Sequence, residues 1–287
     1  MIRRWGMVLG VLVGFLLCDN LAVAADLFVS TWGSGKVYEF TPSGGSSTFA
    51  TGLNMADGLA FDSHGNLFEA DYGSNNIYKF TPDGTRSTFA SGLDGPEALA
   101  FDSSGNLFET DELSGHIYEF TPDGTRSTFA SGIDTPIGLA LGNGNLFVTS
   151  TRFGNIYKFT PDGTQSTFAS GLTGPIGLAF GSGNLFVSDY ESNTIYKFTP
   201  SGSQSVFASG LNYPLGLTFD SSGNLFETDS NSGKIYEFTP SGTRTTFASG
   251  LNEPGGIAFA PLPEPSTIVL LAIAAISFIA YRQRRSA

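Results

Sequence analysis

A repeat of about 40 residues runs through most of the chain and constrains the fold more than any other feature. Its Asn-Leu-Phe signature begins at Asn66, Asn106, Asn145, Asn184 and Asn224, with a variant at Asp26. A Thr-Pro pair follows each copy, with prolines at Pro42, Pro82, Pro122, Pro161, Pro200 and Pro240. The repeats lie near 26–65, 66–105, 106–144, 145–183, 184–223 and 224–260. This periodicity indicates a propeller or a solenoid.

Each repeat is expected to contain four short strands separated by turn-forming residues. In the second repeat the strands are predicted at 66–70, 77–81, 87–91 and 98–101. Asp83-Gly84, Gly92 and the segment 102–106 separate them, and these residue types favour hairpin turns. The strands are apolar on both sides, so each small sheet needs a neighbour on both faces.

The two ends of the repeat region favour a closed ring over an open stack. The region begins with a second strand at Asp26 and ends with a lone first strand at 256–259. The last strand therefore completes the first sheet. We predict an all-β fold over residues 26–260, a six-bladed β-propeller with four-stranded blades, closed by a C-terminal innermost strand.

Three short motifs in the repeat resemble a known group of propellers. They are Pro-x-Gly-Leu-Ala-Phe, Asp-x-x-Gly-Asn-Leu-Phe-x-x-Asp and Ile-Tyr-Lys-Phe. Examples are 175–180 for the first, 184–189 for the second half of the second, and 195–198 for the third. The pattern resembles NHL repeats and the six-bladed, TolB-like SMP-30/gluconolactonase group. This architecture serves hydrolases, lyases and binding platforms, so the resemblance implies the fold and leaves the activity open.

The first 25 residues are predicted to be a secretory signal peptide. Arg3 and Arg4 precede an apolar run at 7–18, and small residues follow at 22–25. A membrane anchor is the weaker alternative because the run is too short to span a bilayer. A lipoprotein signal at Cys18 is also disfavoured, since bulky Leu17 precedes it where a small residue is expected.

Residues 261–287 resemble the PEP-CTERM sorting signal of Gram-negative bacteria. A Pro-Glu-Pro motif leads into an apolar stretch at 268–280 and then a basic tail. The resemblance implies export across the inner membrane, transient anchoring there, cleavage by an exosortase and delivery to the cell surface or matrix. An unprocessed tail anchor is the alternative. The motif residues are Pro263, Glu264, Pro265, Arg282, Arg284 and Arg285.

The charge of the repeat region excludes some partners. Between the two terminal segments the chain has 9 basic and 24 acidic residues, a net charge of −15. Such a surface repels nucleic acid and favours divalent cations, basic partners or solubility alone. The single Cys of the whole chain excludes a disulfide scaffold.

Comparison of the six repeats predicts one uniform rim and one variable rim. The Thr-Pro-Asp-Gly and Asp-Ser-Ser-Gly-Asn turns change little, whereas the loops at the other ends of the strands differ. Aromatic rings beside carboxylates suit sugars or a protein edge, although exposed loops also vary by drift. The candidate binding residues are Trp32, Tyr72, Glu112, Arg152, Phe153, Tyr190, Glu191 and Tyr213.

A metal-dependent hydrolase is the alternative to a binding role. In gluconolactonase-like enzymes, oxygen ligands for a divalent metal stand at the start of innermost strands. The matching positions here are Asp57, Glu97, Ile137, Ile176, Leu215 and Gly255. Only two of the six can be ligands, so no cofactor is expected, with Ca²⁺ or another divalent cation as the alternative.

Two further sets of acidic residues need an explanation. Asp71, Asp111, Asp189 and Asp229 end second strands, where turn capping explains them better than calcium binding does. Glu69, Glu109 and Glu227 stand where other repeats have Val. They are desolvated if they face the next blade, and solvated if they lie toward a rim.

These observations favour a non-catalytic binding or structural module at the cell surface or in the extracellular matrix. Its expected partners are a surface protein or an exopolysaccharide, and the processing exosortase. The near-identity of 81–92 and 121–132 also suits a surface-layer filler without a specific ligand.

Overall fold

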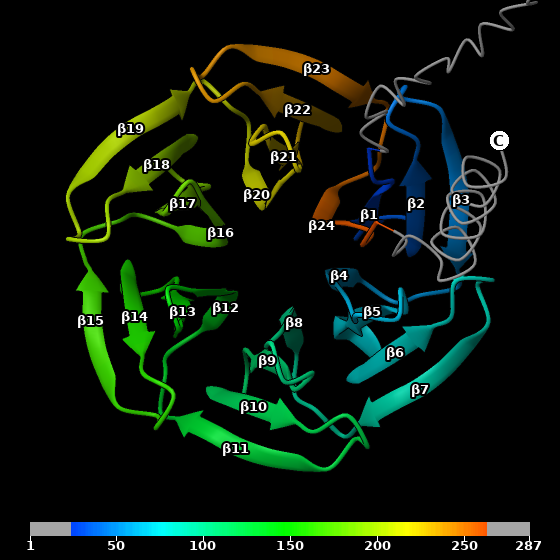
Figure 1. Cartoon of the computed structure of the whole chain (residues 1–287), viewed down its shortest axis with the longest axis horizontal. Helices are drawn as coiled ribbons and strands as arrows, with labels where there is room; N and C mark the ends of the chain where they lie inside the picture. The colour runs from blue at the N-terminus through cyan, green and yellow to red at the C-terminus, as the bar shows by residue number, and fades with distance from the viewer. Residues whose placement is uncertain (1–23, 263–287) are drawn as a thin grey trace, which may run out of the picture.

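The computed structural model describes residues 24–262, in which 24 strands form six four-stranded antiparallel sheets. The sheets are arranged as blades around a central axis (Figure 1). The prediction of an all-β, six-bladed propeller is confirmed. Within the described range the only helical element is one 3-10 turn, η1 (Tyr72–Ser74), and no helix there could span a membrane. The predicted signal peptide, up to residue 23, and the sorting segment from 263 lie outside the described residues.

Each blade has the same order of strands from the axis outward. The innermost strands are β24 (Pro254–Phe259), β4 (Ala56–Phe61), β8 (Pro96–Phe101), β12 (Pro136–Gly142), β16 (Pro175–Gly181) and β20 (Pro214–Phe219). The second strands are β1 (Leu27–Thr31), β5 (Leu67–Asp71), β9 (Leu107–Asp111), β13 (Asn145–Ser150), β17 (Asn184–Asp189) and β21 (Leu225–Asp229). These two lists give the six blades in order, from the first to the sixth.

Two outer layers complete the blades. The third strands are β2 (Lys36–Phe40), β6 (Asn76–Phe80), β10 (His116–Phe120), β14 (Asn155–Phe159), β18 (Thr194–Phe198) and β22 (Lys234–Phe238). The outermost strands are β3 (Ser46–Thr51), β7 (Arg86–Ser91), β11 (Arg126–Ser131), β15 (Gln165–Ala169), β19 (Gln204–Ser209) and β23 (Arg244–Ser249). The strands differ from the predicted ranges by one or two residues at their ends.

The first blade joins the two ends of the repeat region. β24 pairs antiparallel with β1, with Leu27 opposite Phe259, and the Ala260 N–H donates to the Asp26 carbonyl over 2.9 Å. Three strands therefore come from the beginning of the region and one from its end. This closure leaves no unpaired innermost strand among the described blades.

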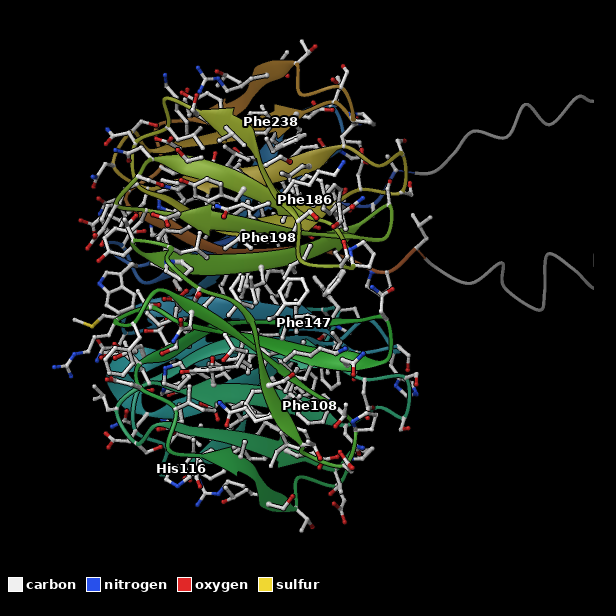
Figure 2. All side chains as sticks on the ribbon, turned by 90° about the vertical axis from the view of Figure 1, so that its left-hand side faces the viewer. Phe108, His116, Phe147, Phe186, Phe198 and Phe238 are labelled. Carbon is white, nitrogen blue, oxygen red and sulfur yellow. The ribbon has the colours of Figure 1, made fainter. Side chains whose placement is uncertain are left out.

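The hydrophobic core lies between neighbouring blades. Phe68 of the second blade packs edge to face on Phe101 of the third, with ring centroids 4.9 Å apart, and Phe147 of the fourth packs on Phe180 of the fifth at 5.0 Å. Figure 2 labels several of these phenylalanines among the strands of the sheets. Such edge-to-face pairs are favourable aromatic geometry. Each blade therefore depends on its neighbour for burial, as the two-sided apolar strands predict.

Candidate functional site

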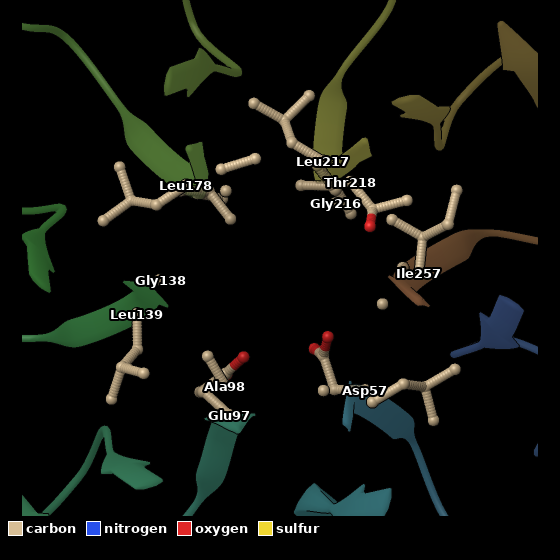
Figure 3. Close-up of a pocket in the computed structure, with 18 of the residues that line it drawn as sticks. Asp57, Glu97, Ala98, Gly138, Leu139, Leu178, Gly216, Leu217, Thr218 and Ile257 are labelled. Carbon is tan, nitrogen blue, oxygen red and sulfur yellow. The ribbon is translucent and has the colours of Figure 1, made fainter. Parts of the chain in front are cut away.

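The innermost strands surround a channel with a cavity of about 940 Å³. Its walls are mainly aliphatic, and Asp57 of β4 and Glu97 of β8 bring carboxyl groups into it side by side (Figure 3). At the matching positions of the next three blades stand Ile137, Ile176 and Leu215. One sector of the channel is therefore acidic, and the matching positions of the next three blades are aliphatic.

The inner strands approach each other so closely that most blades need glycine at the next position. A side chain on Gly138 would overlap the Ile176 carbonyl oxygen of the following blade. The third blade has Ala98 at this position, beside Glu97. The repeat is thus altered in the blade that supplies one of the two channel acids.

The channel acids belong to a longer group of neighbouring polar side chains. The Glu97 carboxyl hydrogen bonds with the carboxyls of Asp57 and Glu112, and the Tyr72 hydroxyl lies beside Glu112. Burial raises the pKa of Asp57 to about 6, the hydrogen bond with Glu97 opposes this rise, and the charge of Glu112 adds to it. Burial and the charge of Asp57 also raise the pKa of Glu97, which is 7% exposed. Carboxyls that bond to each other must share protons.

Hydroxyl side chains connect most of the inner strands, and the acidic sector lacks one. Thr149 accepts a hydrogen bond from Gly138 N–H of its own blade over 2.7 Å and donates to the Ile176 carbonyl of the next blade over 3.1 Å. Three other residues bridge neighbouring blades in the same way: Thr110, Ser188 and Thr228. The second blade has Ala70 at this place. No hydroxyl can therefore reach the Glu97 carbonyl from there.

The predicted rim residues form two aromatic contacts across blade boundaries. Trp32 lies against Tyr72 with ring centroids 5.1 Å apart, and Tyr190 lies against Tyr213 at 4.7 Å. Trp32 and Tyr213 also line the channel. We call the rim end of the channel, lined by Trp32, Tyr213, Ser230, Asn231 and Glu253, the channel mouth.

Tyr213 adopts a backbone conformation that disfavours its side chain. Its φ is 68°, in the left-handed region, where a bulky residue costs roughly 1–3 kcal/mol. The matching residues Met55, Gly95, Thr135 and Glu253 are also left-handed, with φ between 51° and 74°. The conformation therefore belongs to the repeat, and what distinguishes this position is its aromatic side chain, which lines the channel.

The remaining predicted rim residues divide between these groups and the outer loops. Glu112 joins the Tyr72 side of the mouth, and Glu191 accepts a hydrogen bond from the Tyr190 hydroxyl over 3.1 Å. Arg152 pairs with Asp134 at 3.6 Å, and Phe153 is 61% exposed beside it. The structure therefore divides the eight residues into three groups around one rim.

Four aspartates at the ends of second strands are loop caps. The Asp71 carboxylate accepts hydrogen bonds from Asn54 N–H over 2.8 Å and Ser74 N–H over 3.0 Å, and so connects the two variable loops of its blade. Asp111, Asp189 and Asp229 each accept a hydrogen bond from the backbone N–H that matches that of Asn54 in their own blade. The capping interpretation accounts for these residues without a metal ion.

His116 lies in a Ser-His-Asp cluster that the sequence analysis did not anticipate. Ser114 Oγ donates to the Asp111 carboxylate over 2.5 Å, and His116 Nδ1 lies 2.8 Å from Ser114 Oγ. A nucleophilic triad needs the serine to donate to the histidine and the histidine to donate to the aspartate. Here the serine lies between the other two, which fits loop capping. In the second blade, Asn76 contacts Ser74 as His116 contacts Ser114.

Three glutamates of the second strands are fully buried. Glu69, Glu109 and Glu227 are each 0% exposed, and none of their carboxyl oxygens has a hydrogen-bond partner among the described residues. Burial raises the pKa of all three carboxyls. Of the two predicted environments, desolvation between blades is therefore correct, and the solvated rim is wrong.

An arginine accompanies each buried glutamate, and this signal was available in the sequence. Arg86, Arg126 and Arg244 begin the outermost strands of the same three blades, where the others have Ser46, Gln165 and Gln204. Each guanidinium lies over the tyrosine of the third strand, at 4.9–5.0 Å from the ring centroid. Their positive charges oppose the rise in the pKa of the glutamates.

Nothing in residues 24–262 brings three His, Cys, Asp or Glu side chains into the arrangement of a metal site. The predicted sorting residues Pro263, Glu264, Pro265, Arg282, Arg284 and Arg285 lie outside the described residues, so no geometry bears on them.

Solved structures with the same fold include both binding proteins and enzymes. A chain of a nidogen/laminin complex is 24% identical, with 83% of this chain and 98% of that chain covered and a TM-score of 0.76. A streptogramin B lyase is 19% identical, with 82% and 87% covered and a TM-score of 0.67. A structure described as a gluconolactonase is 18% identical, with 74% and 87% covered and a TM-score of 0.65.

These similarities establish the six-bladed propeller fold, with neighbours of the NHL/nidogen, lyase and gluconolactonase-like types. No protein-family model matches the sequence, and no curated protein matches it either. At such identities a shared fold does not carry a shared activity. The function must therefore be argued from the site.

Proposed function

We propose that this chain is an exported, non-catalytic binding module that recognises a macromolecule, a surface protein or an exopolysaccharide, through its variable rim. The observation that carries the proposal is the pair of aromatic contacts at the channel mouth, Trp32 with Tyr72 and Tyr190 with Tyr213. Aromatic rings provide large contact areas for sugars and for protein side chains.

The test is binding to glycan and protein arrays by the full chain and by matched variants. We expect Trp32→Ala or Tyr213→Gly to weaken binding to any ligand found by at least about tenfold. The control is Asp83→Ser on the uniform rim, because Ser201 and Ser241 occupy the matching turn position in the last two blades. The absence of any ligand, or equal binding by the rim variants, would favour a surface-layer filler.

The alternative function, a gluconolactonase-like metal-dependent hydrolase, has one favourable observation. Asp57 and Glu97 do lie together in the channel. The surrounding donor set does not fit a divalent ion, because Ile137, Ile176, Leu215 and Gly255 offer no ligand side chains at the matching positions. Stoichiometric binding of Ca²⁺ or Mg²⁺ by the purified full chain, lost in Glu97→Gln, together with lactone hydrolysis, would establish this alternative.

We also propose that the two terminal segments direct export and surface delivery in a Gram-negative bacterium. The signal-peptide pattern at 1–25 and the Pro-Glu-Pro, apolar and basic segments at 261–287 support this route. Expression in a host with and without its exosortase tests it. Without the exosortase, we expect the full-length chain to accumulate in the inner membrane. With it, a shorter product should reach the surface. Equal distribution in both strains would indicate an ordinary tail anchor.

A further inference from the structure

The carboxyls of the acidic sector lack protein donors. Among the described residues, no N–H group donates to the Asp57, Glu97 or Glu112 carboxyls, and the Tyr72 hydroxyl lies beside Glu112. Glu97 is nine-tenths buried and faces the channel. A buried carboxylate without donors is unfavourable unless it is protonated or paired with a positive charge. These carboxyls therefore favour a positively charged partner.

The protein itself supplies no cation at this place. No described residue that lines the channel is Lys, Arg or His. Arg152, the basic side chain among the rim residues predicted from the sequence, pairs with Asp134 elsewhere on the rim. The region between the terminal segments carries a net charge of −15, which attracts basic groups to the mouth.

The contact between the second and third blades departs from the repeat at the acidic sector. Bridging hydroxyls donate to the inner-strand carbonyls of other blades, whereas Ala70 cannot donate to the Glu97 carbonyl, which packs against Gly58. The two carboxyls on these neighbouring strands suit a ligand that has several donors.

Aromatic faces adjoin these acceptors. Tyr72 lies beside Glu112 and against Trp32, so one continuous set of neighbouring side chains runs from the indole ring to Asp57. A guanidinium group donates through several N–H groups in a plane and also stacks on aromatic rings. A divalent metal ion needs more oxygen ligands than this sector provides and gains nothing from the rings.

We propose that the acidic sector at the channel mouth binds the guanidinium group of an arginine side chain from a protein partner. This inference rests on the proposed binding function and narrows its ligand to a protein with an exposed arginine. Asp57 and Glu97 accept its N–H groups, and the Trp32–Tyr72 pair flanks it. Binding replaces the shared protons of the carboxyls, so affinity increases as pH rises through the pKa of Asp57, about 6.

The chain contains its own reporter for this site. The sequence has two tryptophans, Trp5 and Trp32, and Trp32 lines the channel mouth. A full chain carrying Trp5→Phe has Trp32 as its single tryptophan. Its fluorescence is titrated with three acetylated, amidated tripeptides, Gly-X-Gly, in which X is arginine, citrulline or lysine. Citrulline keeps the shape of arginine without its charge.

We expect a saturable fluorescence change with the arginine peptide and at least about tenfold weaker binding of the citrulline peptide, since the charged hydrogen bonds are lost. The lysine peptide should bind more weakly than the arginine peptide. Glu97→Gln should reduce arginine binding at least about tenfold, whereas the control Glu119→Gln on β10 should not. Added salt should weaken the interaction.

Equal binding of the citrulline and arginine peptides would overturn the inference, as would displacement of the arginine peptide by stoichiometric Ca²⁺. A rim ligand from the arrays that depends on Tyr213 and not on Glu97 would also overturn it while leaving the proposed function intact. If the arrays give no ligand but the arginine peptide binds and this binding depends on Glu97, the acidic site is supported and recognition of polysaccharide is disfavoured.

Discussion

The uniform rim and the variable rim are formed by the ends of the same strands, yet they differ in what holds them. On the uniform rim, the Asp102 carboxylate accepts hydrogen bonds from Ser104 N–H over 2.8 Å and from Asn106 N–H over 2.8 Å within a single turn. On the variable rim, Trp32 contacts Tyr72 and Tyr190 contacts Tyr213 across two blades. The first rim satisfies its polar groups within single turns, whereas the second also carries aromatic side chains that contact each other across blades.

This difference suggests that departures from the repeat mark positions with a role other than folding. The acidic sector, Ala70 and Ala98 depart from the pattern and lie in or near the channel, which Tyr213 of a variable loop also lines. The buried glutamates also depart from it, but they lie between blades. The following substitutions test whether repeated positions control stability and departures control binding.

The largest effect is expected where the repeat is most tightly packed. Gly138→Ala should lower the free energy of unfolding by about 3 kcal/mol, because the new Cβ overlaps the Ile176 carbonyl oxygen. Denaturant unfolding measures the change. The matched control is Ala98→Gly, which removes a Cβ from the same position in the third blade and should change stability by less than about 1 kcal/mol. Equal midpoints for Gly138→Ala and the parent would refute the packing argument.

The next effect concerns a departure that lies away from both rims. Glu109→Val should raise the free energy of unfolding at pH 7 by about 1–3 kcal/mol, because a buried carboxyl without partners is replaced by the residue that three other blades use. Val148→Glu is the reverse substitution and should destabilise the protein. No gain for Glu109→Val would mean that Arg126 offsets the cost of burying the carboxyl.

The pH dependence of Glu109→Val has a defined sign. Burial raises the pKa of Glu109 in the folded protein above 4.5, its ordinary value. The parent protein is therefore favoured at acid pH and loses stability as pH rises above about 4.5, while the unfolded chain releases the proton. The advantage of the valine variant should be small at pH 4 and largest at neutral pH. An advantage that grows on acidification would contradict the raised pKa.

A substitution in a turn of the uniform rim should change stability and leave ligand binding unchanged. Asp102→Ala removes acceptors from two backbone N–H groups and from the Asn106 side chain, and should cost about 1–2 kcal/mol. Ligand binding should remain that of the parent protein. A change in affinity with intact folding would break the distinction between the two rims.

The smallest stability effect is expected on the variable rim. Tyr213→Gly relieves a left-handed backbone conformation but removes the contact with Tyr190, so stability should stay within about 1 kcal/mol of the parent. Ligand binding should nevertheless fall at least about tenfold. The comparison of thermal unfolding with array binding separates the two effects. A large loss of stability would assign Tyr213 to the fold.

The repeat predicted the architecture because each copy carries the same strand and turn signals, so errors at single strand ends do not accumulate. It also placed Asp57 and Glu97 on neighbouring inner strands. The proximity of Glu97, Glu112 and Tyr72 was not predictable, because it depends on loop conformations that differ from blade to blade. The burial of Glu69 was undecided because the same register fits a rim or an interface. The arginine at the position of Arg86 could have resolved this, since the glutamate and the arginine occur together in the same three blades.

The closing strand also places the two ends of the ring at the same edge of the disc. β24 runs from the variable rim to the uniform rim, and β1 begins beside its end, so the chain enters the ring before Leu27 and leaves it after Phe259 at the same edge. A tether at either end, a lipid bilayer or a wall polymer, would hold the uniform rim toward the anchoring layer. The aromatic and acidic mouth would then point away from the cell, toward whatever approaches from outside.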